Sequence, residues 1–344
     1  MSRARRRRNF AIVLTVLIVL GLLAAAVLLR MQAAPEPARL LPECDGILYA
    51  NLKPVRAFAN LGSKSSSWAP EYRSFVEQTG FEFERDLDEV AFAMHAPHDG
   101  QGETRYSEVI VGRFNSAKLT DFLARMARSR ESYRSHEIFL IPYEDRIVRV
   151  TVLSLDMVAV SNTGEAGQID HIIDEYRRSA FASRGPGLLA QYYRKVPFGS
   201  LAWLITQVEL PSGINLDGGL NPLPLLRQLF GGGTVVASAR YNGNVLLRAE
   251  DFLPDENAAK GRAEQIQNLL GLYKATQNQT RPDHPDPDLE SALNSLSVEQ
   301  KDDRVQVSGS LPRGLIEKMI QEPAEAPAQP APPTPKKRGK RHRR

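Results

Sequence analysis

Cysteine is almost absent from this 344-residue chain, which contains only Cys44. An intramolecular disulfide is therefore excluded, although a cysteine-poor chain fits a bacterial envelope as well as the cytosol. The "LPEC" context has no small residue before the cysteine and lies well past the apolar run, which argues against a lipid anchor. We expect Cys44 to be a small buried apolar residue rather than a reactive thiol.

Compact catalytic motifs are also absent. No Gly-x-Ser-x-Gly turn surrounds a serine, and Cys44 has no evident histidine partner. The "FGGGT" at 230–234 lacks the Lys-Ser/Thr of a phosphate loop and precedes a strand, so we interpret it as a flexible turn. These absences favour a non-enzymatic protein with no cofactor. The alternative is an enzyme whose site is assembled from distant residues.

Two clusters hold metal-ligating residue types without the full spacing of a metal site. "HAPHDG", from His95 to Gly100, could hold a metal if a third ligand came from elsewhere, but we favour a solvated loop because Pro97 excludes a helix. "RPDHPDPDLE" at 281–290 offers oxygen ligands to Ca²⁺ but lacks the glycine and the distant glutamate of the known loop motif. We predict a stiff linker there, and no metal site in either cluster.

The body of the chain lacks the positive charge that the formal net value of +4 implies. Residues 31–335 hold 31 Lys or Arg against all 40 Asp and Glu, so this stretch is acidic. The positive charge is concentrated at the two ends, in Arg3, Arg5, Arg6, Arg7 and Arg8, and in Lys336, Lys337, Arg338, Lys340, Arg341, Arg343 and Arg344. The overall basicity is therefore no argument that the body binds nucleic acid.

Only one apolar run is long enough to cross a bilayer. Residues 10–29, "FAIVLTVLIVLGLLAAAVLL", carry no charge and would span about 30 Å as a helix, the thickness of the hydrocarbon core. Arginines within residues 1–9 precede the run, so the positive-inside rule places that end in the cytoplasm. We predict a single-pass, uncleaved anchor with the main domain outside the cytoplasm. A signal peptide cleaved near residues 24–26 is the alternative.

After a predicted spacer at 30–43, apolar strands alternate with amphipathic helices. Strand patterns occupy 47–51, 89–95, 108–114, 137–143, 146–155, 157–161, 201–206, 234–241, 244–250 and 304–310. Asn242-Gly243 predicts a tight hairpin. Helices with an apolar period of about 3.6 residues are expected at 116–129, 165–178, 257–276 and 312–321.

A strand–turn–helix pattern recurs in this part of the chain. The segment from Val109 matches the segment from Val305 at several positions, and the segment from Val158 matches more loosely. "SRGPG" at 183–187 is the expected seam. We predict an α+β fold: an N-terminal transmembrane helix, then two pseudo-repeated mixed-sheet α/β halves at 44–184 and 188–321.

The opening "LPECDGILYANL" follows a loose "LP-x-(C/D)-x-x-x-Y" pattern. Together with the basic start and the single anchor, it resembles uncharacterised bacterial single-pass envelope proteins with a two-part α/β extracytoplasmic domain. The resemblance covers roughly residues 5–321 and implies the same topology. It assigns no catalytic residue.

Residues 322–344 join a Pro/Ala-rich stretch to the C-terminal basic cluster, and we expect this tail to be disordered. Its lysines and arginines are candidates for contact with anionic lipid or an acidic envelope polymer. Nucleic-acid binding through the tail is a further alternative, which would need a cytosolic C-terminus. We therefore expect a membrane-anchored binding or scaffolding protein of the cell envelope, with the lipid bilayer as a partner and its ligand and protein partners open.

Overall fold

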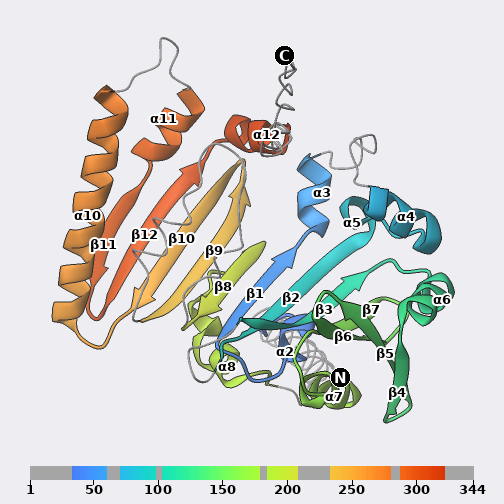
Figure 1. Ribbon diagram of the computed structural model, residues 1–344. Coiled ribbons are helices and arrows are strands. Elements are labelled where there is room, and N and C mark those ends of the chain that lie inside the picture. Colours follow the sequence, from blue (N-terminus) through green and yellow to red (C-terminus); the bar gives the residue numbers. More distant parts are fainter. Residues whose placement is uncertain are drawn as a thin grey trace, which may run out of the picture.

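One continuous β-sheet organises the described part of the protein (Figure 1). The structure, a computed structural model, describes residues 33–59, 70–97, 103–178, 184–207, 233–279 and 287–321. Within these ranges, 12 strands are ordered β11-β12-β10-β9-β8-β1-β2-β3-β7-β6-β5-β4. The α+β class predicted from the sequence is therefore confirmed, with a large antiparallel sheet at its centre.

Every strand predicted from the sequence is present, with ends that differ by up to a few residues. The N-terminal half contributes β1 (Gly46–Asn51), β2 (Leu87–His95), β3 (Arg105–Gly112), β4 (Ser129–Tyr133), β5 (His136–Tyr143), β6 (Arg146–Val152) and β7 (Met157–Ser161). The C-terminal half contributes β8 (Ala202–Thr206), β9 (Thr234–Asn242), β10 (Asn244–Phe252), β11 (Ser297–Lys301) and β12 (Arg304–Leu311). The sequence did not predict β4 and β11, because these edge strands are polar and largely exposed.

The mixed sheet predicted from the sequence is wrong, because every neighbouring pair in the described sheet is antiparallel. Helices do link strands that run in the same direction, as α6 (Ser116–Met126) does between β3 and β4 and α10 (Glu256–Gln279) does between β10 and β11. These parallel strands are not neighbours, since antiparallel strands that follow later in the chain fill the places between them. Alternation of strands and helices cannot show which strands become neighbours.

The five strands nearest the centre have the same order in the two halves, and β5 and β4 extend the N-terminal half further. From the centre outward, one half places β1, β2, β3, β7 and β6, and the other places β8, β9, β10, β12 and β11. A helix follows β7 (α7, Gly167–Arg177) and β12 (α12, Arg313–Gln321). The segment from Val158 is therefore the topological counterpart of that from Val305, although the segment from Val109 matches it better in sequence. Because β1 pairs with β8, the sheet continues across the predicted seam at 183–187, and the domain boundary stays a prediction.

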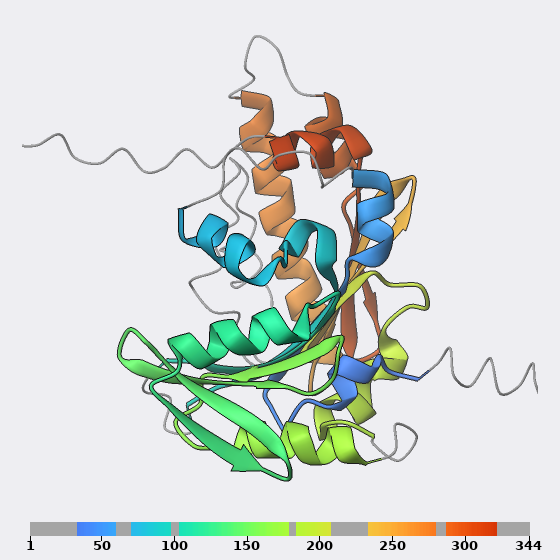
Figure 2. The same cartoon turned by 90° about the vertical axis from the view of Figure 1, so that its right-hand side faces the viewer.

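Helices cover both faces of the sheet (Figure 2). On one face, called the α2 face, pack α2 (Glu36–Arg39), α7 and α8 (Gly187–Tyr192). On the opposite face, called the α10 face, α6 and α10 pack near the two ends of the sheet. The other helical elements are α3 (Lys53–Ala59), α4 (Pro70–Thr79), α5 (Phe83–Asp86), η3 (Tyr193–Lys195) and α11 (Pro287–Asn294). Among the described helices, none is long and apolar enough to cross a bilayer.

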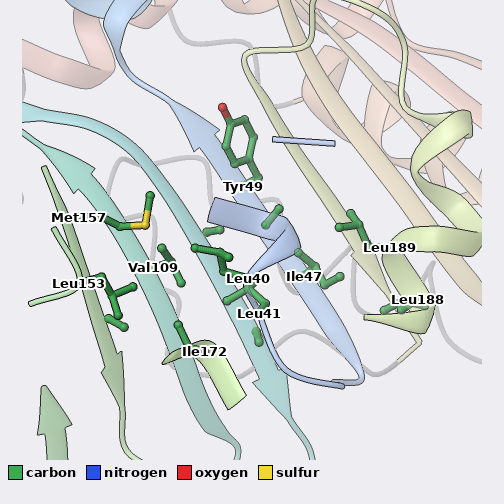
Figure 3. Close-up of a cluster of buried hydrophobic side chains, with 14 of the residues drawn as sticks. Leu40, Leu41, Ile47, Tyr49, Val109, Leu153, Met157, Ile172, Leu188 and Leu189 are labelled. Atoms are coloured by element: carbon green, nitrogen blue, oxygen red, sulfur yellow. The ribbon is translucent and has the colours of Figure 1, made fainter. Parts of the chain in front are cut away.

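The main core lies on the α2 face, beneath α2, α7 and α8 (Figure 3). Leu40 and Leu41, which are 4% and 0% exposed, pack in it beside Ile47 of β1. The predicted spacer at 30–43 is therefore wrong for residues 36–42, which belong to the folded body. Its Ala/Pro composition indicates a linker, but Pro37 is compatible with a first helical turn and two leucines follow that turn.

Two further sequence predictions concern this part of the fold. Trp203, expected in the core, is 3% exposed and stacks on Tyr49 at 5.3 Å between ring centroids. The hairpin predicted at Asn242-Gly243 joins β9 to β10, with Gly243 at a φ of 78°. The predicted anchor at 10–29 and the tail at 322–344 lie outside the described residues.

Candidate functional site

A row of hydroxyl groups lies on the α2 face beside His95. Its Nε2 is 3.0 Å from Ser107 Oγ, which is 3.2 Å from Ser161 Oγ, which in turn is 2.9 Å from Thr163 Oγ1. The register of β2, β3 and β7 places the first three side chains close together. Burial lowers the pKa of His95, although nearby Asp45 acts in the opposite direction, so the imidazole is neutral near pH 7.

The His95–Ser107 distance is that of a nucleophile and its base, but the site is closed. Ser107 and Ser161 are 0% and 1% exposed, so a substrate has no access to either hydroxyl. We assign the row to hydrogen bonding of buried polar groups. His95 itself is the last residue of β2, as the strand predicted at 89–95 has it, so the solvated loop interpreted for 95–100 does not include His95.

The two metal-candidate clusters are only partly described. His98 and Asp99 of the first, and Asp283, His284 and Asp286 of the second, lie outside the described residues. Asp288 lies in the first turn of α11, and its carboxylate is 3.0 Å from Lys318 Nζ of α12. Within the described ranges, no group of three His, Cys, Asp or Glu is placed to hold a metal ion.

Two carboxylates with raised pKa lie on the α10 face. Burial raises the pKa of Glu108 to about 7 and, against the attraction of Arg262, that of Asp251 to about 6. Asp251 is 0% exposed and lies 3.8 Å from Arg262 Nε, an ion pair that joins β10 to α10. Glu108 is on β3, five strands from β10 and thus about 24 Å away across the sheet. The two groups therefore do not form a paired-carboxylate site.

Cys44 is half-buried and packs against the main core, so the buried position expected from the sequence is met only in part. Burial raises the pKa of its thiol to about 12, helped by the charges of Glu43 and Asp45. We predict that the native protein at pH 8 reacts with an aromatic disulfide reagent far more slowly than the unfolded chain, because the thiolate is scarce. An introduced cysteine at exposed Leu155 is the control and reacts at once. Equal rates for the native and unfolded Cys44 thiol would contradict this prediction.

The arginine face is the strongest candidate for a binding site. It is formed by eight of the side chains that β9, β10 and β12 direct to the α2 face: Ser238, Arg240, Arg248, Glu250, Phe252, Arg304, Gln306 and Ser308. Leu246 and Ser310 lie on the same side of the sheet, and Thr234 and Val236 there are buried. In the described structure no helix packs over this face. Only α8 and η3 reach its edge, where the rings of Tyr192 and Phe252 are 5.6 Å apart.

Positive charge is in excess on the arginine face. Arg248 pairs with buried Glu250, and on β11, two strands away, the Lys301 ammonium lies 2.7 Å from Glu299. Arg240 and Arg304 form no ion pair with a described residue. This face therefore offers positive charge on a body whose sequence is acidic overall, and such a surface attracts anions.

Arg304 is held in place by packing rather than by a carboxylate. Its guanidinium carbon lies 5.9 Å from the centre of the Phe252 ring, and Lys195 Nζ lies 5.6 Å from the same ring. The Nε atoms of Arg304 and Arg248 are buried without a hydrogen-bond partner. A guanidinium held this way is available for bidentate contact with a phosphate or carboxylate.

The face is long. Arg240 lies opposite Leu246 and Arg304 lies opposite Phe252, six residues further along β10. At about 3.3 Å per residue the two unpaired arginines are about 20 Å apart along the strands, with Arg248 between them. This spacing fits an extended ligand with repeated anionic groups better than a single small anion.

Sequence reasoning missed the arginine face. The alternation in "TVVASARY" at 234–241 indicated that one side of β9 is polar, but it could not show which residues of β10 and β12 would lie beside it. The site residues that the sequence did predict all lie outside the described residues: Arg3, Arg5, Arg6, Arg7, Arg8 and the tail residues Lys336, Lys337, Arg338, Lys340, Arg341, Arg343 and Arg344.

Comparison with known proteins yields limited similarity. No protein-family model matches the chain. No curated protein matches it. Crystal forms III, I and IV of TP0453 share 11%, 12% and 12% identity with it, at TM-scores of 0.46, 0.40 and 0.42. The matches cover 83%, 84% and 85% of this chain and 98%, 98% and 99% of the TP0453 chains. Similarity this low carries no argument about function.

Proposed function

We propose that the protein is a membrane-anchored, extracytoplasmic binding protein whose arginine face holds an extended anionic ligand. Residues 10–29 are the proposed single-pass anchor, with the N-terminal arginines in the cytoplasm and the body outside. The observation that carries the ligand class is the pair Arg240 and Arg304, unpaired among the described residues on a face without a covering helix. Phosphate or carboxylate groups repeated along an envelope polymer, or presented by lipid headgroups, share the required chemistry.

The test measures binding of fluorescent polyphosphate to the full chain in neutral phosphatidylcholine nanodiscs. We expect the double variant Arg240→Gln/Arg304→Gln to bind about thirtyfold more weakly at low salt, since each arginine contributes roughly 1 kcal/mol to such a contact. The difference should shrink at high salt because the charges are screened. Unchanged affinity of the double variant at low salt contradicts the proposal.

The matched control removes two exposed lysines of the α10 face, Lys118 of α6 and Lys260 of α10. The variant Lys118→Gln/Lys260→Gln loses the same charge, so it should bind polyphosphate almost as well as the unmodified chain. Repeating both measurements with vesicles that contain phosphatidylglycerol separates the two sources of ligand. A loss confined to the vesicles indicates lipid headgroups, and a loss with polyphosphate indicates a polymer.

The basic tail is a second candidate for anion binding. Its linker, 322–335, would reach roughly 40 Å in extended polyproline form. The last described helix, α12, lies at the opposite end of the strands from α2 (Figure 1). Removal of 322–344 should weaken binding to anionic vesicles at low salt more than at high salt. If this deletion abolishes binding and the arginine variant does not, the tail is the ligand site.

A further inference from the structure

The folded body begins very close to the proposed anchor. The apolar run ends at residue 29, and α2 begins at Glu36. Pro37, Ala38, Leu40 and Leu41 are buried, so this segment cannot be drawn out as extra linker without opening the core. The link, 30–35, spans about 20 Å at full extension. The side of the body from which residues 33–35 leave must therefore lie near the bilayer.

That side also carries α8 and the loop from η3 to β8. In Figure 2, α2, α8 and this loop lie together on the right, away from α4, α6 and α10. Contacts fix their positions: the Glu43 carboxylate accepts hydrogen bonds from the Gly187 N–H at 2.9 and 3.0 Å. Gly185 lies so close to α2 that a Cβ on it would be 3.0 Å from Arg39 Cα.

The exposed side chains of this segment suit a lipid headgroup layer. Arg184, Arg194 and Lys195 are exposed, and the first two form no ion pair with a described residue. Phe198, in the loop, is 68% exposed, which is costly in water but favourable at a membrane interface. The acids nearest in sequence to the link are Glu36 and Glu43, and Glu43 already binds the Gly187 N–H. The surface thus combines net positive charge with an unburied aromatic ring.

We propose that these four residues, Arg184, Arg194, Lys195 and Phe198, form an α8 rim that rests in the anionic headgroup layer of the same bilayer that holds the anchor. The inference rests on the proposed anchoring and adds a surface and a partner to it. Contact of the rim with phosphatidylglycerol would orient the body, with the α2 face toward the membrane and the α10 face toward the opposite side. A second protein copy on the rim is the competing occupant.

The test places an environment-sensitive fluorophore on Phe198→Cys in the full chain, reconstituted in nanodiscs with phosphatidylglycerol. Leu155→Cys is the matched control, because Leu155 is 78% exposed and is not part of the α8 rim. Its turn lies near α5, since the Asp156 carbonyl accepts a hydrogen bond from the N–H of Gly112, which packs against Asp86. We expect nitroxide lipids to quench the label at 198 several-fold more than the label at 155, and aqueous iodide to do the reverse. Iodide quenching of both labels alike would overturn the proposal.

Charge reversal gives a second measurement that does not depend on Phe198. Arg184→Glu/Arg194→Glu, combined with the label at 198, should reduce lipid quenching in phosphatidylglycerol nanodiscs more than in phosphatidylcholine nanodiscs. The control Lys118→Glu/Lys260→Glu should leave it unchanged. Equal quenching before and after reversal at the rim argues against headgroup contact. Protection from iodide without lipid quenching assigns the rim to a second copy.

Failure of this inference can be told apart from failure of the proposed function. The polyphosphate test changes Arg240 and Arg304, whereas the rim test changes Arg184, Arg194 and Phe198, so the two sets of variants share no residue. If alkaline carbonate releases the full chain from membranes, residues 10–29 are not an integral anchor, and the α8 rim proposal fails with the anchor. The polyphosphate result does not depend on that outcome.

Discussion

Replacing Leu41 with alanine is expected to lower the free energy of unfolding by about 3 kcal/mol, the middle of the range for large-to-small changes in a core. Leu41 is fully buried and packs with Leu40, Ile47 and the helices of the α2 face. The loss combines the transfer of the removed atoms with the cavity left behind. Urea denaturation of the full chain in detergent, followed by tryptophan fluorescence, measures it.

The exposed residue Leu155 supplies the control for this experiment. Leu155→Ala removes the same atoms from a side chain that is 78% exposed, so its effect should stay within about 0.5 kcal/mol. If Leu41→Ala is as stable as Leu155→Ala, residues 36–42 are a spacer after all. The short link on which the α8 rim depends would then be lost as well.

Glu108→Gln is expected to stabilise the protein at pH 8 by about 3 kcal/mol and to have little effect near pH 4.5. Glu108 lies between Phe92 and Val160 on the neighbouring strands and has no ion-pair partner in the described part of the chain. Burial raises the pKa of its carboxyl from 4.5 to about 7. Each pKa unit corresponds to about 1.4 kcal/mol of difference between the two protonation states.

The sign of the effect follows from proton binding. Between pH 4.5 and 7 the folded state holds the Glu108 proton more tightly than the unfolded chain, so stability falls as pH rises through this window. Above pH 7 the full cost of the buried charge is present, and glutamine removes it. Urea midpoints of the variant and the unmodified protein at pH 5 and pH 8 measure the difference. Subtracting the stability of the unmodified protein from that of the variant at each pH cancels the contributions of other groups. Asp251 lowers stability as pH rises, as Glu108 does, whereas His95 raises it.

Glu264→Gln is the control for this pH series, because Glu264 is exposed in the middle of α10. It should change stability equally little at both pH values. A stability difference for Glu108→Gln that does not grow between pH 5 and pH 8 would show that its carboxyl titrates like an exposed one. The packing of Phe92 and Val160 around it would then be looser than the structure indicates.

Local patterns in the sequence predicted the elements well where one side of an element is apolar. The ten strands and four helices predicted in 44–321 are all present, because alternation and the 3.6-residue period are encoded within a few neighbouring residues. The edge strands β4 and β11 were missed because a polar strand leaves no periodic signal. The helices α2, α3, α4, α5, α8 and α11 were missed as well, and none of them is longer than 10 residues. The mixed sheet was wrong because strand pairing is decided by segments far apart in the chain.

For function, the sequence by itself determined where positive charge is concentrated at the ends and which run could cross a bilayer. Only the tertiary structure brought Arg240, Arg248 and Arg304 onto one face, because the register of β9, β10 and β12 joins residues more than 60 positions apart. Likewise, only packing decided that Leu40 and Leu41 belong to the core and that the link to the anchor is short. The composition of a segment can be read from the sequence, whereas its burial depends on which distant segments pack against it.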